Sequence, residues 1–207
     1  YLLLLDIERN PRLISNYCSY PAVAPAKNKF VLLGPWGFEE MSGIYLYQAG
    51  GNYAEALDIV IPDIHDLSTP KEIVWLDDHN LLLIAGFADG TVTRGGDLFY
   101  YHDMSGRSGK IIASQKLEIA RIKLDKDADK AYLYMAGPEY DTHFTLARDF
   151  YIEEMDLDQL ERLIAEGRLM TLNEDPTRRS LHPIVHDLAW LGLWPALNIL
   201  KPATLTP

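Results

Sequence analysis

The stretch Pro70–Ser114, PKEIVWLDDHNLLLIAGFADGTVTRGGDLFYYHDMSGRSGKIIAS, predicts a four-stranded antiparallel β-meander. The β-branched and aromatic run Glu72–Leu76 is separated by a polar turn from the apolar run Leu81–Phe87, which indicates a hairpin. A glycine-rich loop then leads to a strand at Asp97–His102, and a second turn leads to a strand at Lys110–Ser114.

The same pattern occurs before and after the central meander. An apolar strand ends in glycine at Gly34, Gly86 and Gly137, which are 52 and 51 residues apart. A period near 50 residues is typical of propeller blades or a similar array. Hairpins at this rhythm also occur in unrelated all-β chains, but the near-equal spacing favours repetition. Each glycine precedes a loop and a further strand, expected at Gly43–Gln48, Asp97–His102 and Asp149–Met155.

Length and composition predict one mainly β domain, a β-rich α+β fold. The 207 residues suffice for one well-packed core, and 48% hydrophobic residues is ordinary for a globular protein. We expect a single domain over residues 1–207 with repeated, propeller-like meander units. Its parts are a half unit at 1–18, units at 19–62, 63–114 and 115–170, and a C-terminal apolar cap at 171–207.

The third unit departs from the pattern after its Asp149–Met155 strand. Residues 157–166 place apolar side chains at helical spacing, with acidic residues early and Gly167 as a stop, so they predict a helix. Further on, the apolar residues of Pro183–Leu200 suggest a short helix that is broken at Pro195. We expect this segment to cap an open end of the sheet array.

The charge of the chain restricts the classes of partner. A formal net charge of −11 argues against nucleic acid, whose phosphates require clustered lysine and arginine, and against anionic membranes. The surface favours a basic protein partner, although acidity for solubility alone explains the charge equally well. The sequence leaves the oligomeric state open.

Cysteine content and hydropathy bear on the compartment. Cys18 is the only cysteine, so no intrachain disulfide is possible. No run approaches the ~20 apolar residues of a spanning helix, and we expect a soluble protein of the bacterial cytoplasm or periplasm. The chain begins with Tyr1 rather than Met, so any export signal is expected in a segment before it.

Loops that follow the glycine-ended strands predict a binding site. In an array of such units these loops and the crossovers between units share one end of the structure, and functional residues concentrate on loops over a rigid scaffold. The competing interpretation of each residue is a solvated loop tip. The candidate partner- or ligand-binding residues are Trp36, Glu39, Glu40, His65, Asp66, Asp89, Arg94, Glu139, Tyr140, Asp141 and His143.

Residues that could carry catalysis form no diagnostic motif. Asp63–Asp66 and His182–Asp187 combine histidine with carboxylate, but a zinc site needs three or four converging ligands. Gly95 and Gly96 are followed by neither a helix nor a lysine at the spacing of a phosphate-binding loop. We therefore expect no catalytic residue, no metal and no cofactor.

The segment EIVWLDDHNLLLIAGFADGTVTRGGDLFYYH, residues 72–102, carries a resemblance. It is similar to blade sequences of bacterial propeller-like proteins and of an uncharacterised bacterial domain family with a W-L-D-D…G-G-x-L-F/Y pattern. The resemblance implies a β-meander scaffold and binding. It transfers no catalytic residue, and the predicted helix after Met155 departs from a closed propeller.

The sequence is compatible with two functions. The first is a non-enzymatic protein-binding domain, such as a bacterial immunity protein that neutralises a toxin or effector. Its expected interface anchors are Trp36, Tyr45, Tyr47, Tyr100 and Tyr101. The second is a propeller-like protein that binds, or hydrolyses, a small ligand such as a sugar at the loop face. In both, Trp75 is predicted to lie in the core, because it directly precedes a turn in an apolar strand.

Overall fold

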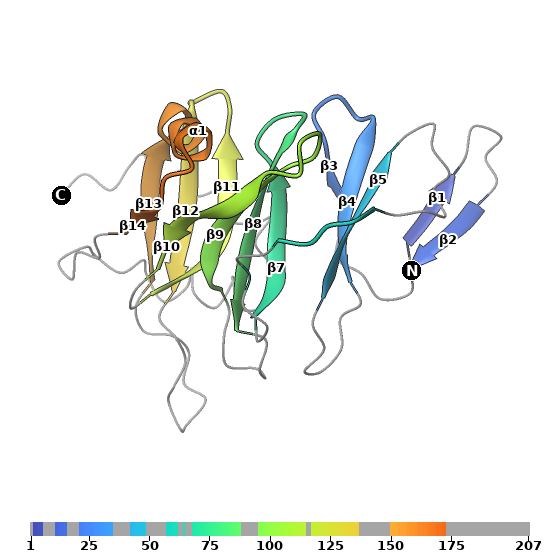
Figure 1. Cartoon of the computed structure of the whole chain (residues 1–207), viewed down its shortest axis with the longest axis horizontal. Coiled ribbons are helices and arrows are strands. Elements are labelled where there is room, and N and C mark those ends of the chain that lie inside the picture. Colours follow the sequence, from blue (N-terminus) through green and yellow to red (C-terminus); the bar gives the residue numbers. More distant parts are fainter. Residues whose placement is uncertain are drawn as a thin grey trace, which may run out of the picture.

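The computed structural model describes residues 2–5, 11–15, 21–34, 42–48, 57–61, 64, 68–87, 95–114, 117–136 and 150–172. The described part of the chain is mainly β, and its sheets follow one another along the molecule in sequence order (Figure 1). The sequence-based prediction of the fold class is confirmed.

The N-terminal part contains a hairpin and a first sheet. The hairpin joins β1 (Leu2–Leu5) and β2 (Pro11–Ser15) antiparallel. The first sheet is an antiparallel meander of β3 (Ala22–Val23), β4 (Lys29–Gly34), β5 (Gly43–Gln48) and β6 (Leu57–Asp58). The strands β4 and β5 follow the predicted bounds closely.

The central sheet is the predicted meander with one addition. Its consecutive antiparallel strands are β7 (Ser68–Trp75), β8 (Asn80–Phe87), β9 (Asp97–His102) and β10 (Ser108–Ala113). A fifth strand, β14 (Met170–Thr171), pairs parallel with β10. This late strand was not predicted.

The third sheet has three strands and is followed by a helix. It is a meander of β11 (Glu118–Asp125), β12 (Lys130–Ala136) and β13 (Phe150–Asp156), and α1 (Leu157–Glu166) follows directly. Gly167 ends the helix in the left-handed conformation at φ 60°, and its N–H bonds to the Ile164 and Leu163 carbonyls. The predicted helix is confirmed at its predicted bounds.

The sheets stack face to face and enclose two hydrophobic cores. One core lies between the first and central sheets and contains Val31 and Leu46 from one side and Trp75 from the other. The second lies between the central sheet and the third, and buried Leu160 of α1 adds to it. The central sheet is therefore covered on both faces.

The double coverage explains the continuous apolar run of β8. Side chains of a strand alternate between the two faces of its sheet. Leu81 and Leu83 point into the first core and Leu82 and Ile84 into the second, and all four are fully buried. A strand with only one buried face would alternate apolar with polar residues instead.

Burial confirms one aromatic prediction and contradicts another. Trp75 is 6% exposed and belongs to the first core, as predicted. Tyr47, Tyr100 and Tyr101 were expected to be interface anchors, but they are 9%, 6% and 8% exposed. Tyr100 and Tyr101 are buried because β9 packs against a neighbouring sheet on each side, and Tyr47 of β5 stacks on Phe30. Within the described residues, no helix is long and apolar enough to cross a membrane.

Candidate functional site

The predicted loop-face residues cannot be placed, because each of them lies outside the described residues: Trp36, Glu39, Glu40, His65, Asp66, Asp89, Arg94, Glu139, Tyr140, Asp141 and His143. The segment 182–187 lies outside them too. Among the residues that the structure does describe, no group of three histidine, cysteine or acidic side chains is arranged to hold a metal ion.

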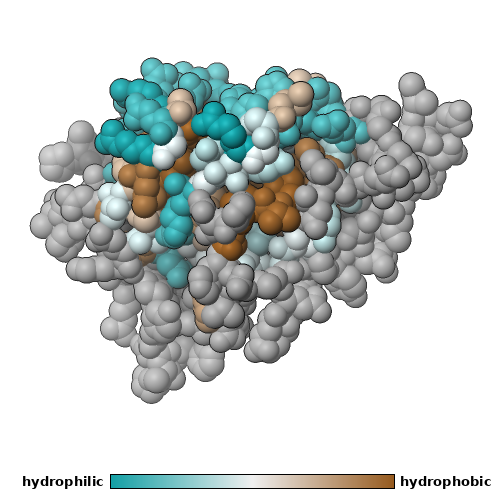
Figure 2. Space-filling view, in the orientation of Figure 1, coloured by the Kyte–Doolittle hydropathy of each residue, from teal (hydrophilic) through white to brown (hydrophobic). Residues whose placement is uncertain are grey.

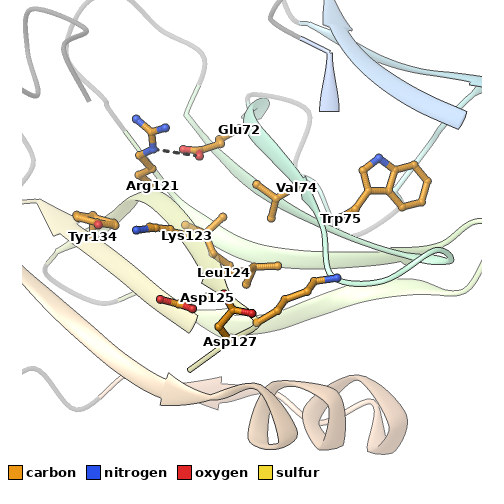
Figure 3. A pocket seen from close by; sticks show the side chains of 11 residues that line it. Glu72, Val74, Trp75, Arg121, Lys123, Leu124, Asp125, Asp127 and Tyr134 are labelled. Carbon is orange, nitrogen blue, oxygen red and sulfur yellow. Dashed lines mark ion pairs between the residues drawn. The ribbon is translucent and has the colours of Figure 1, made fainter. Parts of the chain in front are cut away.

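A cleft of about 660 Å³ opens between β7 of the central sheet and β11 of the third sheet. Both are the first strands of their meanders and lie at the edges of their sheets. Figure 3 shows polar side chains of β11 and β12 around an apolar middle. The lining residues are Glu72, Val74, Trp75, Arg121, Ile122, Lys123, Leu124, Asp125, Lys126, Asp127 and Tyr134.

The floor of the cleft is apolar because the cleft borders the second core. Ile122 is a buried member of that core, and Val74 and Leu124 are half-buried and pack against it. The alternation of β11 then sends Arg121, Lys123 and Asp125 to the opposite side from Ile122 and Leu124. The strand thus supplies both the apolar floor and the polar rim.

Glu72 of β7 is a half-buried acidic group of the cleft. Its side chain is 25% exposed, its carboxylate accepts a hydrogen bond from the Ile122 N–H, and it lies 3.5 Å from the Arg121 Nε (Figure 3). Burial raises the pKa of Glu72 from 4.5 to about 7, although Arg121 and the Ile122 N–H oppose the rise. Glu72 therefore exchanges a proton near neutral pH.

The remaining polar groups are arranged along β11 and its neighbour. Tyr134 of β12 lies directly opposite Arg121 in the sheet, and burial raises the pKa of the Tyr134 phenol. Lys123 follows Arg121 on the same face, and Asp125 and Asp127 lie further on towards the β11–β12 turn. Along β11, Arg121 and Lys123 therefore precede Asp125.

A second polar cluster joins the first and central sheets. The Lys29 ammonium forms an ion pair with Asp103, and the His79 Nδ1 lies 3.0 Å from the other oxygen of Asp103. The side chains of Lys29 and Asp103 are 6% and 1% exposed, while His79 is half exposed and stacks on His102. The cluster joins the ends of three hairpins, β3–β4, β7–β8 and β9–β10.

Sequence reasoning missed the β7–β11 cleft. One signal was available: Glu72 places a charge directly before the apolar run Ile73–Leu76, in the meander predicted to be central. A charge at such a position requires a partner, and the structure supplies Arg121. The identity of that partner depends on the packing of two separate meanders.

Comparison with known proteins identifies relatives of uncharacterised function. No curated protein matches the sequence. A crystal structure of a candidate conserved lipoprotein from Clostridium novyi NT is similar, with a TM-score of 0.54 and 18% sequence identity, over 68% of this chain and 88% of that one. At this identity the likeness concerns the fold alone.

The sequence also matches a protein family over residues 34–145, which is more than half of the chain. This range includes β7, β11 and β12 and thus every residue that lines the cleft. The chain therefore belongs to the family described as the domain of unknown function DUF4652.

Proposed function

We propose that this protein is a non-enzymatic binding protein and that the β7–β11 cleft takes a small hydroxylated ligand such as a monosaccharide. One observation carries the proposal: a cleft of about 660 Å³ combines an apolar floor with a few converging polar groups. Ligand sites typically enclose about 300–1,000 Å³ and share this composition. The Tyr134 ring supplies an aromatic face, and Glu72 and Arg121 supply an acceptor and donors for hydroxyl groups.

Thermal shift measurements with a panel of monosaccharides, sugar acids and sugar alcohols test this function. At least one class should raise the melting temperature of the wild type and leave that of Lys123→Trp unchanged, because the indole would obstruct the cleft. Glu161→Trp on the exposed side of α1 is the matched control and should respond like the wild type. If no compound distinguishes wild type from Lys123→Trp, the cleft is not the binding site.

A basic protein partner is the second candidate, as for an immunity protein that neutralises a toxin. Hydrophilic side chains gather over the end of the molecule that carries α1 and the hairpin turns (Figure 2). Exposed acids lie on β13 and α1, namely Glu154, Asp156, Asp158, Glu161 and Glu166. Together with the net charge of −11, they support attraction of a cationic surface.

Salt dependence separates the second candidate from the first. Capture of a basic protein by the wild type should weaken steeply as salt rises, because screening shortens to ~8 Å at physiological ionic strength. The double variant Asp158→Lys/Glu161→Lys should lower its association rate. Capture that is insensitive to both changes would exclude this surface as the interface.

Two further parts of the proposal concern the repeated units and the compartment. We propose that the three sheets are successive units of a propeller-like repeat, since each is an antiparallel meander and they stack in chain order. An extracytoplasmic location is proposed from the lipoprotein description of the Clostridium novyi NT protein.

A further inference from the structure

We propose that the ligand of the β7–β11 cleft carries a carboxylate, that Arg121 and Lys123 bind this carboxylate, and that Glu72 takes up a proton when it binds. The inference rests on the proposed small-ligand function and adds the charge of the ligand and its coupling to pH. It follows from the placement of three side chains and from the acid–base chemistry of one of them.

The cationic part of the cleft is formed by neighbours on one strand. Arg121 and Lys123 are two residues apart on β11 and thus lie on the same side of the strand. Lys123 forms no ion pair within the described part of the chain. A guanidinium presents donors in a planar fork that matches a carboxylate, and an adjacent ammonium adds charge.

Glu72 decides whether this part of the cleft accepts an anion. Its contact with the Arg121 Nε is long, at 3.5 Å, and Arg121 is 36% exposed. An ionised Glu72 repels an incoming carboxylate and competes with it for Arg121. A protonated Glu72 removes the repulsion and donates a hydrogen bond to an oxygen of the ligand. Because burial brings the pKa of Glu72 to about 7, both forms are populated near neutral pH.

The acidic residues of the cleft favour a singly charged anion over a doubly charged one. Asp125 and Asp127 line the same cleft closer to the β11–β12 turn, and Lys126 between them offsets part of their charge. A phosphate with two negative charges would be repelled by these carboxylates more strongly than a carboxylate would. The hydroxyl groups of the ligand can instead donate to Asp125 and Asp127.

Isothermal titration calorimetry of the full chain with D-galacturonate, D-galactose and inorganic phosphate tests the inference at pH 6 and pH 8. Galacturonate should bind more tightly than galactose at pH 6, and more tightly than phosphate at pH 8, where phosphate carries two negative charges. If galacturonate binds the protonated form of Glu72, its affinity should fall about tenfold at pH 8, given a pKa of about 7. Proton uptake should appear as a dependence of the binding heat on the ionisation enthalpy of the buffer at pH 7.

Matched variants separate charge from folding. Glu72→Gln keeps the shape of a neutral carboxyl, so its galacturonate affinity at pH 8 should equal that of the wild type at pH 6. Arg121→Gln should lower the affinity at pH 6 at least tenfold, whereas Arg107→Gln, the same charge change on the exposed β9–β10 turn, should leave it unchanged. Equal melting temperatures of the apo variants would establish that each is folded.

The alternative outcomes have different meanings. If galactose binds as tightly as galacturonate and Lys123→Trp blocks both, the cleft binds sugars but the carboxylate inference is wrong. If phosphate binds more tightly than galacturonate, the anion class is wrong. If galacturonate binds equally at both pH values, the role of Glu72 is wrong. If Lys123→Trp binds all three probes like the wild type, the proposed function itself fails.

Discussion

Trp75 joins the first and central sheets through three kinds of contact. It lies in the first core at 6% exposure, and its indole N–H donates a hydrogen bond of 2.8 Å to the Ala22 carbonyl of β3. The Lys29 ammonium lies 5.2 Å from the centre of its ring. One residue therefore supplies apolar area, a hydrogen bond and a cation–π contact between two sheets.

Trp75→Ala should lower the free energy of unfolding by about 3–5 kcal/mol, the usual cost of removing a buried tryptophan. Trp75→Phe should cost less, because it keeps most of the apolar contact and loses only the hydrogen bond and some area. Urea denaturation followed by circular dichroism measures both. An alanine variant as stable as the wild type would contradict the assignment of Trp75 to the core.

Asp103 holds two positive or potentially positive groups from different hairpins, Lys29 and His79. Removing one partner of a buried pair leaves the other charge uncompensated, which typically costs about 3–5 kcal/mol. Asp103→Asn should therefore be destabilising by about 3 kcal/mol, while the double variant Lys29→Met/Asp103→Asn should cost less than the sum of Lys29→Met and Asp103→Asn. Denaturation of the wild type, both single variants and the double variant gives the coupling energy, and strict additivity would show that the pair is not coupled.

At the scale of elements, three glycines allow the backbones of the central and third sheets to approach closely. Gly96 and Ile119 exchange backbone hydrogen bonds of 3.1 and 3.0 Å, which ties the start of β9 to β11. A Cβ on Gly96 would overlap the Ala85 carbonyl, and one on Gly95 would overlap the Ile119 carbonyl. Gly86 faces Gly95 in the same way. Because Gly86, Gly95 and Gly96 have no side chain, the backbone segments at these positions can lie close together.

Gly96→Ala should cost about 3 kcal/mol, at the upper end of overpacking effects, because backbone rather than a flexible side chain occupies the space. Gly106→Asn is the control: Gly106 has φ 66°, no atom lies within 4 Å of the position that a Cβ would take, and asparagine tolerates this conformation. Thermal unfolding should separate the two variants clearly. Equal stability of both variants would mean that the backbones at Gly96 and Ala85 can move apart without loss of stability.

For the whole molecule, Glu72 predicts how stability depends on pH. Its pKa is about 7 in the folded protein and 4.5 ordinarily, so the folded state holds the proton more tightly. The free energy of unfolding should fall as pH rises from about 4.5 to 7, by on the order of 3 kcal/mol from this group. Arg121 and the Ile122 N–H face the carboxyl from β11 and Tyr134 from β12, and Lys71, whose pKa burial lowers to about 8, titrates above this window.

The difference in free energy of unfolding between Glu72→Gln and the wild type, measured against pH, separates the contribution of Glu72 from that of other carboxyl groups. Asp156, for example, has its pKa lowered by the hydrogen bond from Lys130 and acts in the opposite sense at lower pH. Relative to the wild type, Glu72→Gln should gain stability from pH 5 to pH 8. A difference that stays constant over this range would contradict the raised pKa.

The sequence predicted hairpins better than it predicted their contacts. Polar turns and terminal glycines located the strands β4, β8 and β12, and helical spacing of apolar residues located α1. These signals act over a few residues, so the sequence alone contains them. The cleft arises where the edges of two meanders meet, and nothing local in Glu72 or Arg121 specifies that meeting. The two buried faces of β9 were missed for the same reason, since burial by a neighbouring sheet depends on stacking.

The parallel pairing of β14 with β10 affects the order in which the sheets unfold. After α1 the chain returns from the third sheet and closes a loop onto the central one through Ile112↔Met170 and Ala113↔Thr171. The third sheet therefore cannot separate while this short strand is in place, whereas the first sheet has no equivalent return within the described residues. Under mechanical load or in native-state hydrogen exchange, the amides of the first sheet should open before those of the central and third sheets, which open together.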